Sequence, residues 1–125
     1  MDKSELPFIS ATELASLIET REVSPVEVTE AYLERIPQFD PQLNSYITVT
    51  ADRAIADARR AEQEILSGKY RGPMHGVPTA VKDQVYTKGI LTTGGSSILK
   101  DFVPDEDATV MTKLNAAGAV LLGKL

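Results

Sequence analysis

The sequence predicts a mixed α/β fold whose first half is helical and whose second half carries strands joined by glycine-bearing turns. Two complete helix-start signatures occur before residue 30, and short segments at 45–50 and 77–81 have strand character. All eight glycines lie at Gly68 or later, where tight turns and close backbone approaches are expected. The length of 125 residues supports one small domain with a core of its own.

The first helix is predicted over about 11–21. Ser10 followed by Glu13 forms a capping box, in which the two residues satisfy each other's free backbone N–H groups. Ile9 and Leu14 stand at the spacing of a hydrophobic staple, which fixes the angle at which the chain enters the helix. The positions expected to be buried are Leu14, Leu17 and Ile18.

The second helix is predicted over about 25–36. Ser24 and Glu27 repeat the capping box, and proline at the first helical position suits the start of a helix. Proline removes a backbone N–H and restricts the residue before it, so Pro37 and Pro41 predict an irregular passage after Ile36. The positions expected to be buried are Val28, Ala31, Tyr32 and Ile36.

A short strand is expected over 45–50, followed by a third helix over about 51–66 that ends at Gly68. One stripe of that helix carries small apolar residues, which let it lie close to a sheet or to another helix. The stripe consists of Ala54, Ala58, Ala61 and Ile65. The first half is interpreted as packing scaffold without active-site residues, because catalytic groups concentrate on loops that such scaffolds hold.

The most informative pair in the second half is Lys82 and Asp83, which follow the strand predicted at 77–81. Most lysines lie in water, but this one stands between an apolar run and a polar loop. A free lysine has a pKa near 10.4, so only about one in 2,500 is neutral at pH 7. Burial disfavours the ammonium and would make Lys82 a general base for a hydroxyl nucleophile. The sequence leaves that burial open.

The end of the chain predicts one more helix and one more strand. Asp107 is interpreted as the cap of a helix over about 108–117, where the helix dipole favours an acidic residue. Gly118 ends that helix, and the apolar run 119–122 predicts a buried strand.

Other arrangements of reactive side chains are possible on paper. Ser96, His75 and Asp83 contain the residue types of a catalytic triad, which only geometry could justify. The simpler interpretation places His75 in a loop and the segment 92–97, with its hydroxyl groups and glycines, in a structural turn. Ser97 and Lys100 match Ser-x-x-Lys without the companion motifs of penicillin-recognising enzymes.

No cofactor and no metal ion is expected. The chain has one histidine and no cysteine, and the acidic run 101–107 lacks the spacing of a calcium loop.

The distribution of charge bears on partners. The formal net charge is −5, with 13 acidic and 6 basic residues in 1–67 against 5 and 7 in 68–125. Neither half is basic enough to follow a phosphate backbone, so direct nucleic-acid binding is not expected. Apolar runs are too short for a membrane span, and the first seven residues lack a signal-peptide stretch. These features favour a cytoplasmic protein that does not bind membranes.

Ordered matches to one known family run through most of the chain. In the second half they are His75-Gly76-Val77-Pro78, Val81-Lys82-Asp83, Gly89, Thr92-Thr93, Gly95-Ser96, Pro104, Asp107-Ala108, Leu114, Ala116-Ala117-Gly118-Ala119 and Gly123-Lys124. In the first half they are Ser10-Ala11-Thr12-Glu13-Leu14, Val23-Ser24-Pro25-Val26-Glu27-Val28 and Leu43-Asn44. On these residues the chain resembles the amidase signature family from about Ser10 to Leu125.

The resemblance implies an α/β/α sandwich around a large mixed β-sheet, of which this chain would form the N-terminal portion. It implies hydrolysis of a carboxylic amide C–N bond by a Ser–cis-Ser–Lys triad, with Lys82 as the catalytic lysine and Asp83 in a supporting role. The family's two serines lie beyond the stretch matched by Gly123-Lys124, so residues 1–125 alone are expected to be inactive. One incomplete domain would then comprise a helical scaffold, 1–67, and the start of the catalytic core, 68–125.

Two alternatives remain open at this point. One is the glutaminase subunit of a tRNA-dependent amidotransferase, which has the same fold. The other is a small non-catalytic protein that binds a partner through a sheet edge. The expected partners of an amidase are a small-molecule amide substrate and the remainder of the amidase chain, with a homodimer as a further arrangement.

Overall fold

The computed structural model describes residues 2–125. Four α-helices and three strands form the described part of the chain, with short 3₁₀ turns at Leu6–Phe8 and Ser97–Leu99. The helices are α1 (Ala11–Glu19), α2 (Pro25–Leu43), α3 (Ala51–Leu66) and α4 (Thr109–Ala116). The strands are β1 (Thr48–Val49), β2 (Pro78–Val81) and β3 (Val120–Lys124). Within residues 2–125 no helix is both long enough and apolar enough to cross a bilayer.

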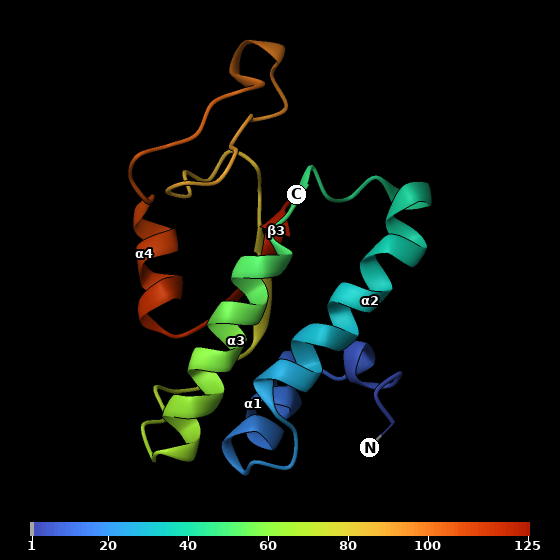
Figure 1. The fold of residues 1–125 in the computed structure, drawn as a ribbon, viewed down its shortest axis with the longest axis vertical. Coiled ribbons are helices and arrows are strands. Elements are labelled where there is room, and N and C mark those ends of the chain that lie inside the picture. Colours follow the sequence, from blue (N-terminus) through green and yellow to red (C-terminus); the bar gives the residue numbers. More distant parts are fainter. Residues whose placement is uncertain (1) are drawn as a thin grey trace.

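The strands form a mixed sheet with the order β1-β3-β2. β3 pairs in parallel with β2 and antiparallel with β1, and the register of β2 shifts between Thr79 and Ala80. Every residue of β3 is buried, because helices pack on both faces of the sheet. In Figure 1, α3 lies in front of the strands, with α4 and α2 to either side. This arrangement confirms the expected mixed α/β class.

Each face of the sheet has its own core. On one face, small residues of α3 pack against the strand, as the alanine stripe predicts: Ala54 and Ala58 contact Val120 and Leu122. On the other face, Met111 of α4 packs with Val81 and Leu121. A third core joins α1, α2 and the end of α3, and includes Leu14, Ile18, Val23, Val28 and Ile65. Backbones can approach closely where alanine faces the sheet, which is why α3 lies so near β3.

The predicted starts of the first two helices are confirmed. The Ser10 hydroxyl accepts a hydrogen bond from the Glu13 N–H at 3.2 Å. Around Ser24 the capping box is complete, because its hydroxyl accepts from the Glu27 N–H at 3.1 Å and the Glu27 carboxylate accepts from the Ser24 N–H at 2.9 Å. Local sequence therefore determines where α1 and α2 begin.

The predicted end of the second helix at Ile36 is wrong. α2 continues through Pro37 and Pro41 to Leu43, and Asn44 ends it with a left-handed φ of 51°. The two prolines are four residues apart and lie on the same, more accessible side of the helix. Water can hydrogen-bond the carbonyl groups that lack a donor there, which lowers the cost of an interior proline.

Two further predictions about the ends of elements need correction. The strand expected over 45–50 is reduced to Thr48–Val49, because the Asp40 carboxylate accepts from the N–H groups of Ser45 and Tyr46. Asp107 does not cap α4, whose N-cap residue is Ala108. The Asp107 carboxylate accepts instead from the Lys88 N–H at 2.7 Å and from the Asn115 side-chain amide at 3.2 Å.

Candidate active site

The carboxyl end of β2 presents Lys82. The backbone on either side of this residue is attached to the end of β3: the Leu125 N–H donates to the Val81 carbonyl at 2.9 Å, and the Asp83 N–H donates to the Leu125 carbonyl at 2.6 Å. In sheets with parallel strands, ligands bind beyond the carboxyl ends of the strands. Lys82 therefore occupies the edge of the sheet where a site is expected.

The Lys82 side chain is exposed, whereas its neighbours Val81 and Asp83 are buried. An extended chain alternates its side chains between two faces, so Lys82 points away from the face that Val81 and Asp83 share. The burial of Lys82 that the sequence leaves open is not present among residues 2–125.

Asp83 holds the turn that follows the polar loop. Its side chain is 2% exposed, and one carboxylate oxygen, Oδ2, accepts from the Thr93 N–H at 2.9 Å and from the Thr93 hydroxyl. Its backbone carbonyl accepts from the Gly94 N–H at 2.9 Å. The other carboxylate oxygen, Oδ1, has no hydrogen-bond partner among residues 2–125. Asp83 therefore fixes the position of this turn, and its supporting role in catalysis stays a prediction.

A second lysine, Lys124, lies buried beside Asp83. Its Nζ donates to the Val85 carbonyl at 2.6 Å and to the Thr92 hydroxyl at 2.8 Å, and lies 4.0 Å from Asp83 Oδ1. Burial lowers the pKa of the Lys124 ammonium, while the Asp83 carboxylate opposes this shift. Lys124 is not among the site residues predicted from the sequence, although it follows the apolar run 119–122 much as Lys82 follows its own strand.

The segment 92–97 forms a structural turn, as predicted. Gly94 and Gly95 adopt left-handed φ values of 58° and 70°, and Thr93 is buried beneath them. The Ser96 hydroxyl accepts from the Ile98 N–H at 3.2 Å and so caps the 3₁₀ turn. Lys100 forms an exposed ion pair with Asp101 at 2.6 Å, so its ammonium is engaged with a carboxylate.

The alternative triad of Ser96, His75 and Asp83 is not assembled. His75 precedes β2 and Asp83 follows it, so the two residues lie at opposite ends of the strand. The His75 ring is buried, and its Nδ1 accepts from the Arg71 N–H at 3.1 Å. Its Nε2 lies 3.0 Å from a Glu64 carboxylate oxygen. Burial lowers the pKa of His75, with Glu64 opposing the shift.

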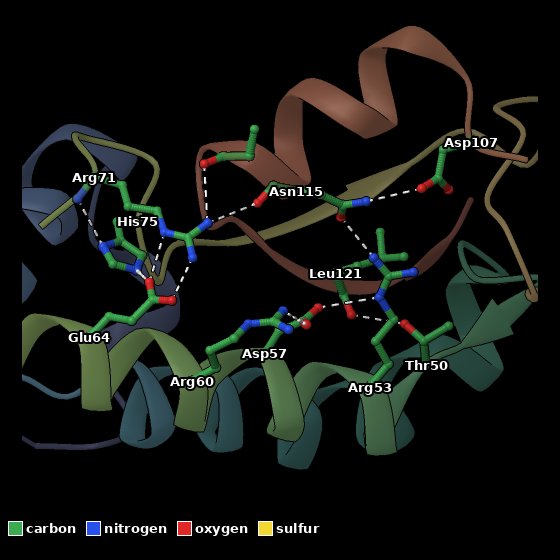
Figure 2. Close-up of polar contacts among 11 residues, drawn as sticks. Thr50, Arg53, Asp57, Arg60, Glu64, Arg71, His75, Asp107, Asn115 and Leu121 are labelled. Carbon is green, nitrogen blue, oxygen red and sulfur yellow. Dashed lines mark hydrogen bonds and ion pairs between the residues drawn. The ribbon is translucent and has the colours of Figure 1, made fainter. Parts of the chain in front are cut away.

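A polar network joins α3 to α4 at the end of the sheet that carries His75 (Figure 2). The Arg71 guanidinium binds both oxygens of Glu64, at 2.8 and 2.5 Å, and thereby lowers the pKa of that carboxyl. Arg53 donates to the Asn115 side-chain oxygen at 2.8 Å and to Asp57 at 3.3 Å. All of these groups have protein partners, which is typical of a structural network. Residues 2–125 contain no group of three or more histidine or acidic side chains that could hold a metal ion.

Comparison with known proteins identifies the family. A family model described as Amidase matches residues 27–125. The chain is 47% identical to "Putative amidase AmiD" of Mycobacterium tuberculosis over all 125 residues, which is 26% of that protein. It is 50% identical over 113 residues to a glutamyl-tRNA(Gln) amidotransferase subunit of Methylococcus capsulatus, which covers 90% of this chain and 23% of that protein. The chain thus spans about a quarter of the length of the curated relatives it matches.

Solved structures agree with the sequence comparison. A fatty acid amide hydrolase structure superposes with a TM-score of 0.91 at 28% identity, covering 98% of this chain and 22% of the other. Native peptide amidase from Stenotrophomonas maltophilia superposes with a TM-score of 0.87 at 35% identity, covering 95% of this chain and 25% of the other. With the family model matching most of its residues, the chain belongs to the amidase signature family.

Proposed function

We propose that these 125 residues are the N-terminal part of an amidase that hydrolyses a small-molecule carboxylic amide, and that Lys82 is the base of its catalytic triad. The observation that carries the proposal is the place of Lys82, on a backbone pinned to β3 at the carboxyl ends of two parallel strands. The identity of 47% over the full chain to a protein named as an amidase supports the same reaction class.

The chemistry proposed for Lys82 requires its neutral amine. The amine would accept a proton from the hydroxyl of a cis serine, which in turn accepts the proton of the nucleophilic serine. The oxygen of the nucleophilic serine then attacks the carbonyl of the substrate amide. The amine part of the substrate leaves with a proton, and water then releases the acid part from the acyl-enzyme. Backbone N–H groups near the nucleophile would stabilise the oxyanion. Both serines belong to the part of the protein beyond these residues, which would also cover the exposed Lys82 side chain.

Residues 1–125 alone are therefore proposed to be inactive towards amides. A lysine without its two hydroxyl partners has no nucleophile to activate, and Ser96 and Ser97 do not replace them. Ser96 caps a 3₁₀ turn, and Ser97 is exposed at the start of that turn.

A second candidate is the glutaminase subunit of a tRNA-dependent amidotransferase. The observation that favours it is the 50% identity to a glutamyl-tRNA(Gln) amidotransferase subunit over 113 residues. Such a protein would release ammonia from glutamine for a partner protein. Residues 68–125 carry a formal net charge of +2, which does not favour a direct contact between these residues and tRNA.

The test begins with the coding sequence beyond Leu125. The proposal requires two serines there, the first in a Gly-Gly-Ser-Ser-Gly-Gly stretch and the second roughly two dozen residues later. The protein encoded by the extended sequence is expected to hydrolyse simple aliphatic or aryl amides, while the 125-residue chain does not. Glutamine hydrolysis seen only after a partner co-purifies would favour the amidotransferase. A coding sequence that stops at Leu125 and yields a folded monomer would refute both and favour a partner-binding protein.

A further inference from the structure

Two buried charged groups lie directly behind the proposed catalytic lysine. Lys124 is fully buried, and Asp83 is 2% exposed. We propose that Lys124 is a positioning residue of the amidase reaction, which fixes the backbone that carries Lys82 through Asp83 and the loop 85–92. The inference rests on the proposed function and extends it to a residue that the triad does not contain.

Lys124 holds together the two ends of a loop. Its Nζ binds the Val85 carbonyl at 2.6 Å and the Thr92 hydroxyl at 2.8 Å, so one ammonium joins the two ends of the segment 85–92. The Thr92 hydroxyl donates in turn to the Ile90 carbonyl at 3.0 Å. Hydrogen bonds from a charged donor are stronger than neutral ones, and burial excludes competing water.

Hydrogen bonds connect this loop to the backbone next to Lys82. Thr93 follows the loop and donates two hydrogen bonds to the Asp83 carboxylate, and Gly94 donates to the Asp83 carbonyl. On its other side, Asp83 donates to the Leu125 carbonyl, next to Lys124 in the chain. The Lys82 backbone is therefore held between the end of β3 and a turn that Lys124 stabilises from beneath.

The complete burial of Lys124 excludes a direct catalytic role for its ammonium. An ammonium with no exposed surface cannot reach a substrate, and it lies on the same face of the sheet as the buried Asp83, opposite to Lys82. Stability alone is a weak reason for such a pair, because a buried ion pair replaced by well-packed apolar residues often loses nothing. The hydrogen bonds of Lys124 do specify one geometry of the loop, which an apolar side chain could not do.

The kinetic test uses the full-length protein and the variant Lys124→Met, which keeps an unbranched side chain one atom shorter and removes its charge. We expect kcat to fall at least about tenfold, since misplacement of a reacting group by about 1 Å can cost a hundredfold. KM should stay within about twofold, because no substrate contact is removed. Lys113→Met is the matched control: Lys113 is exposed on α4, and its loss should leave kcat and KM unchanged within about twofold.

A destabilised control separates positioning from general loss of stability. Ile65→Ala removes buried volume from the core between α1, α2 and α3, away from the loop. It should lower the melting temperature without a selective loss of kcat, when both variants are assayed at a temperature where circular dichroism shows them folded. If Lys124→Met retains kcat within twofold of wild type, or loses it only as much as Ile65→Ala does, the inference is wrong.

Hydrogen exchange gives a readout that does not depend on catalysis. In Lys124→Met the N–H groups of Thr93 and Gly94, which donate to Asp83, should exchange at least about tenfold faster, while those of α1 and α2 keep their rates. Unchanged exchange at Thr93 and Gly94 would overturn the inference even in an active enzyme. A wild-type full-length protein without amide hydrolysis would instead contradict the proposed function, so the two failures are distinguishable.

Discussion

Gly118 and His75 fit against each other where the chain turns from α4 into β3. Gly118 has a left-handed φ of +76°, and its carbonyl accepts from the Gly76 N–H at 2.9 Å. A Cβ atom added at Gly118 would lie 2.4 Å from His75 Cδ2. The buried ring therefore occupies the space that a side chain would need, and residue 118 must be glycine for two separate reasons.

Substitution of Gly118 by alanine should be clearly destabilising. Left-handed backbone costs an L residue roughly 1–2 kcal/mol, and overpacking against the buried ring adds typically about 1–3 kcal/mol. Gly89→Ala is the matched control, because Gly89 has nearly the same φ, +75°, with no atom within 4 Å of the added Cβ. Chemical denaturation should show a larger loss of unfolding free energy for Gly118→Ala than for Gly89→Ala. Equal losses would mean that the contact with His75 does not matter.

His75 should make the stability of the fold depend on pH. Burial lowers the pKa of the folded His75 from its ordinary value of 6.5, while Glu64 opposes the shift and Arg71 reinforces it. Between the lowered pKa and 6.5 the unfolded chain binds more protons than the folded chain, so the unfolding free energy falls as pH falls below about 6.5. Above pH 6.5 this contribution is fully present.

The measurement is denaturation at several pH values between about 5 and 7 for wild type and for His75→Asn, whose side-chain oxygen can still accept from Arg71. The stability of the variant should vary less over this range. Glu64 does not interfere, because its own pKa is lowered from 4.5 and its contribution is lost only at more acidic pH. A variant with the same pH dependence as wild type would assign the effect to other groups.

The environments of Lys82 and Lys124 show how far the sequence predicts a site. Each lysine follows an apolar strand, so strand periodicity alone treats them alike. Lys124 is buried because the loop 85–92 folds over it and supplies two oxygen atoms. Lys82 is exposed because side chains alternate between the two faces of the sheet, and its neighbour Asp83 takes the buried face. Long-range contacts of this kind leave no local signal. The role proposed for Lys82 therefore rests on the family resemblance, whereas the role proposed for Lys124 rests on contacts of the fold.

At the scale of elements, the starts of α1 and α2 were predictable, whereas the end of α2 and the cap of α4 were not. Capping contacts are local: the full capping box forms at Ser24, and at Ser10 the hydroxyl accepts from the Glu13 N–H while no return bond from the Glu13 side chain is present within residues 2–125. The part of α2 beyond Pro37 makes contacts that leave no signal in the pattern before Ile36: the Asp40 carboxylate accepts from the N–H groups of Ser45 and Tyr46, and the Arg35 guanidinium lies 4.3 Å from the centre of the Phe39 ring. A long-range contact likewise determines the position of Asp107, because its carboxylate accepts from the Lys88 N–H instead of capping α4.

Removal of one interior proline should stabilise α2. Pro37→Ala restores a backbone N–H within the helix, and the gain is expected to be about 1–2 kcal/mol after allowance for the greater freedom of the unfolded chain. Gln38→Ala, at the next position of the same helix, is the control and should change stability by less than about 0.5 kcal/mol, because Gln38 is exposed. Equal unfolding free energies for wild type and Pro37→Ala would show that α2 does not continue through Pro37 in solution.

At the scale of the whole molecule, the two halves of the chain differ in charge and in structure. Residues 1–67 carry most of the negative charge and form the helices that cover one face of the sheet, while 68–125 carry both proposed functional lysines. The described sheet has only three strands, and the chain spans about a quarter of its curated relatives. The proposed site lies at the edge where these strands end, and the proposal places its remaining residues outside these three strands.

The most direct test of the account is the kcat/KM of the full-length protein with Lys82→Ala. We predict a fall of at least about a hundredfold in amide hydrolysis, the usual contribution of a general base. Lys88→Ala, which removes an exposed lysine from the neighbouring loop, should stay within about threefold of wild type. Hydrolysis by Lys82→Ala at the wild-type rate would contradict the assignment of Lys82 as the base.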